Sequence, residues 1–166
     1  MWYDEKKRDV MKKIRILFVC HGNICRSPMA EFLMKDLAAK KGVTDRFEIA
    51  SAATSTEEIG NPVYPPARRK LAEHGLRCDG KTAVQMKKAD YEKYDYLVCM
   101  DSWNLRNMHR ITGGDPQNKF IRLLDLTDLK RDVADPWYTD DFDATWNDLT
   151  VGCDALLEKL LRKELS

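Results

Sequence analysis

Apolar residues along the chain gather in four short runs, and each run is bounded by polar or turn-forming residues. Short apolar runs without alternation are typical of strands that are buried on both faces of a sheet. We therefore predict four buried strands, at residues 14–19, 47–50, 96–100 and 120–124.

Between these runs, apolar residues recur every three or four positions, which is the period of an amphipathic helix. The clearest case lies near the C-terminus, where Phe142, Trp146 and Leu149 begin a series that continues to Leu160. We predict helices at residues 28–41, 66–74 and 103–111, followed by this long C-terminal helix.

The ends of two helices carry recognisable signals. Ser27 is a suitable N-cap for the first helix, Pro28 suits its first position and Gly42 suits its exit. Asp140 and Asp141 precede the C-terminal helix, where negative charge favours the positive end of the helix dipole.

Strands and helices alternate, which predicts an α/β fold with a mainly parallel sheet. Such sheets bind ligands at the carboxyl ends of their strands, near the point where the strand order reverses. The junction between the first strand and the first helix is therefore the first place to look for function. We expect residues 14–166 to form a single domain, preceded by a charged extension at residues 1–13.

Composition narrows the possible functions. The chain has 166 residues, of which 43% are hydrophobic, and 28 basic against 27 acidic residues leave a formal charge of +1. This balance argues against broad electrostatic binding to nucleic acid or to anionic membranes. The longest wholly apolar stretch, residues 16–20, is far shorter than the roughly 20 residues of a membrane-spanning helix. The first residues also lack the apolar segment of a signal peptide.

The cysteines form no recognisable framework. There are five, an odd number, and no two have C-x-x-C spacing, which argues against a disulfide scaffold and a zinc knuckle. This pattern favours a cytoplasmic protein with mostly reduced thiols, and it leaves open whether one thiol is reactive.

The junction after the first predicted strand contains a cysteine followed, at the sixth position, by an arginine and then a serine. This spacing alone is a weak signal, but its position between a buried strand and a capped helix strengthens it. The residues of the junction are Cys20, His21, Gly22, Asn23, Ile24, Cys25, Arg26 and Ser27.

A loop that enters a helix N-terminus points several backbone N–H groups at a common centre and can bind an oxyanion there. Gly22 adopts positive φ freely, and Asn23 tolerates it better than most residues. Arg26 adds a planar guanidinium that can hold two phosphate oxygens. The same dipoles and cation favour the thiolate form of Cys20, which would be a nucleophile behind a bound phosphorus atom.

Thiolate attack on a phosphate monoester also needs an acid that protonates the leaving oxygen. The best candidate is Asp135, because Pro136 stiffens its loop and favours extended backbone at the preceding residue. Trp137 and Tyr138 would wall the same site with flat apolar faces that suit an aromatic ring. An ordinary Asp-Pro turn is the alternative interpretation of these residues.

After residue 13, nearly the whole chain resembles the low-molecular-weight protein tyrosine phosphatase family. Residues 19–31 resemble the signature loop and following helix of that family, and residues 51–55 and 59–62 resemble its second characteristic region. The sequences Cys99-Met100-Asp101 and Asp135-Pro136 follow in the family's order and at roughly its spacing.

The resemblance implies a role for each reacting residue. Cys20 would form a phosphocysteine intermediate. Arg26 would bind the phosphoryl oxygens and stabilise the transition state. Asp135 would protonate the leaving group and then activate the water that hydrolyses the thiophosphate.

The resemblance also implies supporting roles, a fold and partners. Asn23 and Ser51 would hold the loop in shape, and the Ser27 hydroxyl would hydrogen-bond to the Cys20 sulfur. The fold would be flavodoxin-like, with a four-stranded parallel sheet flanked by helices on both faces, and neither a metal nor an organic cofactor would be needed. The expected partners are a phosphotyrosine-containing protein and an oxyanion such as inorganic phosphate in the loop. We expect a monomer or a weak dimer.

Cys25 lies in the same loop as Cys20. By resemblance it would form a reversible disulfide with Cys20 and so protect the thiolate from over-oxidation. Packing beneath the loop is the alternative. Cys78, Cys99 and Cys153 are expected to be core residues.

The rim of the site departs from the family pattern. Glu57 stands where members often carry an aromatic residue, and Trp137 stands where many carry tyrosine. The aromatic wall would then come from Trp137 and Tyr138 alone. Glu57 would slightly repel acidic phosphopeptides and could attract basic ones.

Three other functions are compatible with such a loop. The first is hydrolysis of phosphoarginine, but Ile24 stands where arginine phosphatases of this type tend to carry threonine, and its apolar side chain suits a phenyl ring better. The second is arsenate reduction, which needs a close pair of resolving thiols, whereas Cys78 and Cys99 are far apart in the sequence. The third is phosphate binding without turnover, although Cys20, Arg26 and Asp135 are all present.

Overall fold

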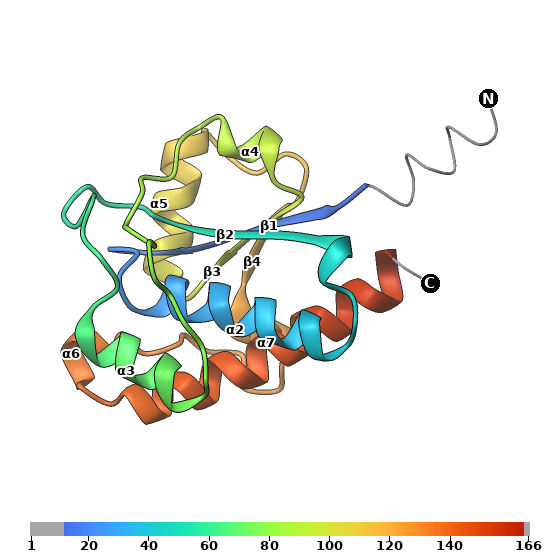
Figure 1. Ribbon diagram of the computed structural model, residues 1–166. Coiled ribbons are helices and arrows are strands. Elements are labelled where there is room, and N and C mark those ends of the chain that lie inside the picture. Colours follow the sequence, from blue (N-terminus) through green and yellow to red (C-terminus); the bar gives the residue numbers. More distant parts are fainter. Residues whose placement is uncertain (1–11, 165–166) are drawn as a thin grey trace.

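The computed structural model describes residues 12–164 and arranges them around one parallel sheet (Figure 1). The strands run in the order β2-β1-β3-β4, so β1 is flanked by β2 and β3. The predicted α/β class and the four-stranded parallel sheet are confirmed. The strands are β1 (Ile14–Cys20), β2 (Phe47–Ala53), β3 (Tyr96–Cys99) and β4 (Phe120–Arg122).

Helices cover both faces of the sheet, as a parallel sheet with crossover connections requires (Figure 1). One face carries α2 (Arg26–Lys40), α3 (Pro65–Glu73) and α7 (Phe142–Glu164), with the short α6 (Pro136–Thr139) beside α3. The other face carries α4 (Asp90–Lys93) and α5 (Ser102–Thr112). Two 3-10 turns complete the chain, η1 (Thr44–Arg46) and η2 (Leu123–Leu126).

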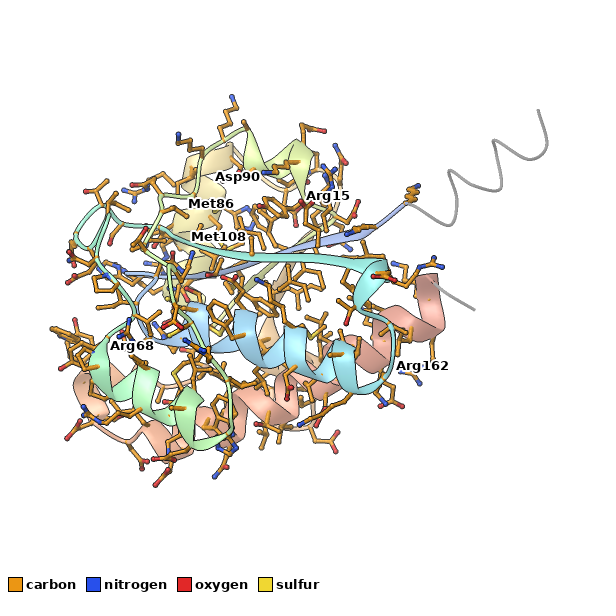
Figure 2. All side chains as sticks on the ribbon, viewed as in Figure 1. Arg15, Arg68, Met86, Asp90, Met108 and Arg162 are labelled. Atoms are coloured by element: carbon orange, nitrogen blue, oxygen red, sulfur yellow. The ribbon has the colours of Figure 1, made fainter. Side chains whose placement is uncertain are left out.

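The side chains of β1 alternate between two cores, which explains why its apolar run is continuous. Ile16 and Phe18 are fully buried in the larger core, which β1 forms with α2 and α7. Leu17 and Val19 face the smaller core on the α5 side. Figure 2 shows Met108 in this smaller core. Helices on both faces therefore account for the sequence pattern.

The predicted start of the first helix is wrong in one respect. α2 begins at Arg26 instead of Pro28, and Cys25 occupies the cap position without a side-chain capping bond. Ser27 lies inside the first turn, because its hydroxyl contacts Cys20 and Asn23 of the preceding loop. The residue that resembles a helix cap is therefore part of the candidate site.

The ends of β1 and β3 differ from the predictions by one residue, and those of β2 and β4 differ by more. β2 continues to Ala53, because its last residues pair with Val19 and Cys20 at the end of β1. β4 ends at Arg122, and the apolar residues that follow enter the 3-10 turn η2, where Leu123 and Leu124 are buried. Leu123 and Leu124 are therefore apolar because they belong to the core, although they lie outside the strand.

The parallel strands bring their carboxyl ends to one edge of the sheet. The chain crosses from β1 to β2 on one side and returns to β3 on the other side, so the strand order reverses beside β1. The loop after β1 therefore lies at the position where open α/β sheets bind ligands.

The predicted charged extension, residues 1–13, lies outside the described residues except for Lys12 and Lys13. Across residues 12–164, no helix combines the length and the apolar character needed to cross a bilayer.

Candidate active site

The loop after β1 turns its backbone carbonyl groups outward. The carbonyl oxygens of Cys20 and His21 accept hydrogen bonds from the N–H groups of Thr54 (2.9 Å) and Ser55 (3.0 Å), and Tyr64 N–H donates to Ile24 (2.9 Å). Because the N–H and C=O of a trans peptide unit point in opposite directions, these bonds aim the following N–H groups at the centre of the loop. The loop is therefore shaped to bind an anion.

The turn of the loop depends on Asn23 and not on Gly22. Asn23 has a φ of 60°, whereas Gly22 has no positive φ. Asn23 thus adopts the positive φ that it tolerates, and Gly22 does not use its greater conformational freedom. The Asn23 side chain stabilises this conformation, because its Oδ1 accepts a hydrogen bond from Val84 N–H at 3.1 Å.

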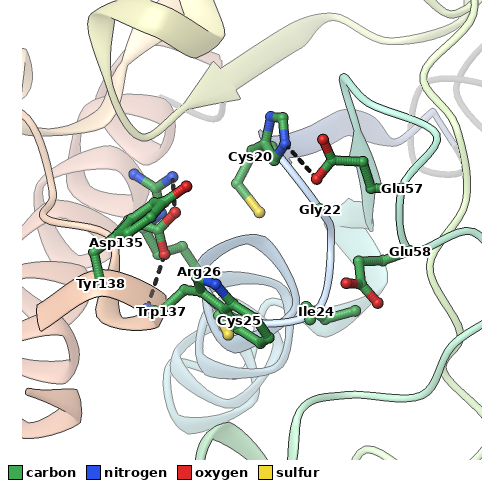
Figure 3. A pocket seen from close by; sticks show the side chains of 11 residues that line it. Cys20, Gly22, Ile24, Cys25, Arg26, Glu57, Glu58, Asp135, Trp137 and Tyr138 are labelled. Atoms are coloured by element: carbon green, nitrogen blue, oxygen red, sulfur yellow. Dashed lines mark hydrogen bonds and ion pairs between the residues drawn. The ribbon is translucent and has the colours of Figure 1, made fainter. Parts of the chain in front are cut away.

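A small cavity of about 110 Å³ opens above this loop (Figure 3). It brings together the predicted reacting residues and the predicted rim, although they come from three distant parts of the sequence. Its walls are formed by Cys20, His21, Gly22, Ile24, Cys25, Arg26, Glu57, Glu58, Asp135, Trp137 and Tyr138.

Cys20 lies at the base of the cavity and its residue is 3% exposed. Its Sγ is 2.9 Å from Ser27 Oγ, and the Ser27 N–H points at it from 3.4 Å. The first turn of α2 follows directly, so the positive end of the helix dipole also faces the sulfur. All three contacts favour negative charge on the sulfur.

A chain of hydrogen bonds sets the direction of the Ser27–Cys20 contact. Because Val84 N–H can only donate, the Asn23 amide must present its oxygen to Val84 and its Nδ2 to the other side. Asn23 Nδ2 then donates to Ser27 Oγ (2.7 Å) and to Ser51 Oγ (3.0 Å). The Ser27 hydroxyl proton is left to donate to Cys20 Sγ.

This series of hydrogen bonds ends at an ion pair of Glu31, which the sequence pattern did not indicate. Ser51 Oγ donates to Glu31 Oε1 at 2.6 Å, and Glu31 is 6% exposed. Lys35 Nζ bonds to the other Glu31 oxygen at 2.7 Å, and Lys81 Nζ lies 3.9 Å from Oε1. Burial lowers the pKa of Lys81, and the charge of Glu31 opposes that shift. Neither Glu31 nor Lys81 touches the cavity, so their place in the site is visible only in three dimensions.

Arg26 is held from behind by groups that fix its guanidinium. Its Nη1 donates to Asp101 Oδ2 at 2.7 Å and to the Val133 carbonyl at 2.8 Å. Burial by itself lowers the pKa of Arg26, but the negative charges of Cys20, Asp101 and Asp135 outweigh it and raise the pKa further. Arg26 is therefore a permanent cation beside the sulfur.

Asp101 is a further residue that the sequence pattern did not assign to the site. It lies two residues after Cys99, the last residue of β3, and this position near a strand end was the signal in the sequence that could have identified it. Its Oδ1 also caps α5 by accepting a hydrogen bond from Asn104 N–H at 2.7 Å. The same carboxylate thus caps α5 and orients the Arg26 guanidinium.

Asp135 faces the loop from the far wall of the cavity (Figure 3). Its backbone is extended, with φ of −79° and ψ of 113°, as the following proline predicts. Oδ1 caps α6 by accepting from Trp137 N–H at 3.0 Å, while Oδ2 lies 3.4 Å from Arg26 Nη2. The helix cap fixes one carboxylate oxygen and leaves the other directed toward the anion loop.

The rim of the cavity is open to solvent. Trp137 is 52% exposed and Tyr138 is 83% exposed, and Glu57 accepts a hydrogen bond from His21 Nε2 at 3.0 Å. Glu58, which the sequence analysis did not consider, also lines the cavity. The apolar wall is completed by Ile24 from the loop itself.

The five cysteines are all unpaired, and all five are buried. Burial, followed by the negative charges of Cys20 and Asp135, raises the pKa of the Cys25 thiol far above its usual range. Cys78, Cys99 and Cys153 lie in the two cores, as expected. Burial raises the pKa of Cys99 to about 12. Within residues 12–164, no three His, Cys, Asp or Glu side chains come together as a candidate metal site.

Known proteins resemble this chain over almost its full length. A family model described as low molecular weight phosphotyrosine protein phosphatase matches residues 15–166. The low molecular weight protein-tyrosine-phosphatase YfkJ of Bacillus subtilis is 38% identical over 154 residues, which cover 91% of this chain and 98% of the relative. A low molecular weight phosphotyrosine protein phosphatase of Mus musculus is 38% identical over 149 residues, covering 87% and 94% of the two chains.

Solved structures agree with these sequence matches. The crystal structure of YfkJ superposes with a TM-score of 0.89 at 36% identity, covering 92% of this chain and 98% of the other. An arginine phosphatase of Drosophila has a TM-score of 0.79 at 26% identity, covering 88% and 97%. The predicted family is thereby confirmed: this chain belongs to the low molecular weight phosphotyrosine protein phosphatases.

Proposed function

We propose that the protein hydrolyses phosphotyrosine in other proteins through a phosphocysteine intermediate on Cys20. One observation carries the proposal. The hydrogen bonds from Val84 through Asn23 to Ser27 leave a hydroxyl proton directed at Cys20 Sγ, in the centre of a loop that presents N–H groups. This arrangement stabilises a thiolate where it can attack a bound phosphoryl group.

In the first step, the Cys20 thiolate attacks the phosphorus atom opposite the tyrosyl oxygen. The S–P bond forms while the P–O bond breaks, and the carboxylic acid of Asp135 gives its proton to the departing phenolate oxygen. Arg26 and the loop N–H groups bind the three non-bridging oxygens, where negative charge is spread in the transition state.

In the second step, the Asp135 carboxylate takes a proton from water, and the water oxygen attacks phosphorus. The S–P bond breaks, which releases inorganic phosphate and regenerates the Cys20 thiolate. Asp135 ends protonated, as it began. Water and the chain's own residues balance every proton and electron pair, so we expect turnover in the presence of EDTA.

The cavity walls favour an aryl phosphate as substrate. Ile24, Trp137 and Tyr138 present apolar faces around the opening, which suit the ring of phosphotyrosine. Ile24 offers no hydrogen-bonding atom to a guanidinium, which phosphoarginine would present.

The test compares two phosphopeptides of the same sequence, one with phosphotyrosine and one with phosphoarginine. Phosphate release is measured from pH 4 to 8 in EDTA, for the wild type and for Cys20→Ser. We expect the wild type to hydrolyse the phosphotyrosine peptide and the variant to release no phosphate from either. Circular dichroism and vanadate binding establish that the variant is folded with an intact loop. Faster hydrolysis of phosphoarginine, or activity that survives in Cys20→Ser, would contradict the proposal.

We also propose that the enzyme acts in the cytoplasm, as a monomer or a weak dimer. The five unpaired cysteines fit a reducing compartment. Light scattering over a range of protein concentrations tests the oligomeric state, and a stable dimer at low concentration would contradict this part.

A further inference from the structure

A second hollow of about 440 Å³ adjoins the active-site cavity on the side of α3. The two hollows share Ile24, Glu58 and Trp137, so they are continuous along one wall. We call the second hollow the arginine groove. Its other walls are Asn61, Pro62, Val63, Tyr64, Pro65, Arg68 and Arg69.

The groove carries two cations that have no side-chain partner among residues 12–164. Arg68 and Arg69 are exposed on α3, and neither makes a side-chain hydrogen bond or ion pair with residues 12–164. The acidic residue on the groove wall is Glu58, and its Oε2 already accepts a hydrogen bond from Asn61 Nδ2 at 2.6 Å. The groove therefore presents net positive charge to a ligand.

The position of the groove is fixed relative to Cys20. Tyr64 N–H donates to the Ile24 carbonyl of the anion loop at 2.9 Å, and Tyr64 O accepts from Arg68 N–H at 2.9 Å. The Tyr64 and Trp137 rings are 4.9 Å apart between centroids. Figure 2 shows Arg68 at the end of the molecule where α3 and α6 meet. The arginine side chain thus extends from a backbone that is bonded to the catalytic loop.

We propose that the arginine groove binds an acidic residue of the substrate protein that lies next to the phosphotyrosine in sequence. This inference rests on the proposed function, because a phosphotyrosine bound over Cys20 directs the adjoining peptide across Ile24 and Trp137 into the groove. A carboxylate there would pair with the planar guanidinium of Arg68. Arg69 is expected to contribute less to binding this carboxylate, because it also lines a neighbouring hollow that contains Asp140 and Asp141.

The charges around the opening would also orient the peptide. Glu57 lines the cavity but not the groove, Glu58 lies on the wall that the two hollows share, and the two arginines lie beyond it on the α3 side. An acidic residue is favoured on the α3 side and disfavoured beside Glu57. The expectation that acidic phosphopeptides are repelled by Glu57 therefore applies to one side of the phosphotyrosine only.

The test uses two pairs of phosphotyrosine peptides. In one pair, the two residues that precede the phosphotyrosine are both glutamate or both glutamine. In the other pair, the same exchange is made at the two residues that follow the phosphotyrosine. We expect the wild type to favour glutamate in one pair by about fivefold in kcat/KM, the size of one exposed ion pair. This preference should weaken with added salt. Arg68→Glu should abolish or reverse it, and Arg69→Glu should reduce it less.

Arg110→Glu is the matched control. It makes the same change of charge at an exposed residue of α5, on the opposite face of the sheet. It should leave the glutamate preference intact, and hydrolysis of p-nitrophenyl phosphate should be equal in all these variants. Equal turnover of glutamate and glutamine peptides by the wild type, or a preference that survives Arg68→Glu, would overturn the proposal that the arginine groove binds an acidic residue. No hydrolysis of p-nitrophenyl phosphate by the folded wild type would instead overturn the proposed function.

Discussion

The floor and the rim of the active site are built in opposite ways. The floor consists of Asn23, Arg26, Ser27 and Ser51 around Cys20, and each of the four is at most 2% exposed. The rim consists of Glu57, Trp137 and Tyr138, whose rings or carboxylate stand largely in solvent.

This difference separates chemistry from substrate choice. A buried polar group that lacks a partner is costly, so the floor residues can adopt only the arrangement in which their hydrogen bonds are all made. The rim residues are hydrated in the absence of substrate, so they can vary without disturbing the floor. We therefore expect substitutions in the floor to change the rate for every substrate, and substitutions in the rim to change the rate for some substrates.

The largest expected contrast is between Cys20 on the floor and Cys25, which lines the same cavity. Burial raises the pKa of Cys25, so this thiol is uncharged at neutral pH and becomes reactive only when the pH approaches that raised value. At pH 7 we expect iodoacetate to modify Cys20 at least about 100-fold faster than Cys25, since each unit of pKa changes the thiolate population tenfold. Fragment-ion mass spectrometry locates the adduct, and inorganic phosphate should protect Cys20. Equal labelling of the two cysteines would remove this contrast.

Asp135→Ala tests the proposed role of this residue as the general acid. For phenyl phosphate, a poor leaving group, we expect kcat/KM to fall by about 10²–10⁴-fold, the usual contribution of a general acid. For p-nitrophenyl phosphate the loss should be much smaller, because that phenolate departs without a proton. Asp128→Ala, at an exposed carboxylate outside the site, is the control. An equal loss for both substrates would contradict the role of Asp135.

Ser27→Ala removes the hydroxyl that donates to Cys20 Sγ. A hydrogen bond to a charged group contributes roughly 1.5–3 kcal/mol, so we expect kcat/KM to fall by about 10- to 100-fold. Ser51→Ala acts one hydrogen bond further from Cys20 and should lower kcat/KM by a smaller factor. A larger effect at Ser51 than at Ser27 would contradict the proposed direction of the hydrogen bonds.

Trp137→Ala is the smallest expected effect, because it changes the rim alone. We expect kcat/KM for a phosphotyrosine peptide to fall by about threefold to tenfold, the range of one lost aromatic contact. Hydrolysis of p-nitrophenyl phosphate at saturating concentration should change less. A similar loss of kcat for both substrates would show that the rim cannot be separated from the floor.

The local part of the site could be predicted from the sequence. The loop from Cys20 to Arg26 follows a continuous apolar run and precedes a helix, so its place at the strand end needs no distant contact. Asp135 could be predicted because Pro136 restricts its backbone, and the structure has that extended backbone. The β2 and β4 boundaries were less accurate, because they depend on pairing with β1 and on burial against α7.

The distant part of the site left no local signal. Asp101 and Arg26 are 75 positions apart, and Glu31 joins the site only through Ser51 on a neighbouring strand. Lys81 lies in an irregular segment, and no sequence pattern links it to Glu31, because only the fold brings the two side chains together. Ser27 shows the opposite case: its local pattern indicated a helix cap, which the structure does not have, whereas the resemblance implied the contact with Cys20 that the structure has.

The most direct test looks for the phosphoryl group on the sulfur itself. Asp135→Ala is mixed with p-nitrophenyl phosphate in EDTA and quenched by denaturation within the first turnover, because this variant lacks the base that activates water in the second step. Mass spectrometry should find one added phosphoryl group on Cys20 and none in the double variant that also carries Cys20→Ser. Release of p-nitrophenol with no adduct on Cys20, and equal release by the double variant, would contradict nucleophilic catalysis by this cysteine.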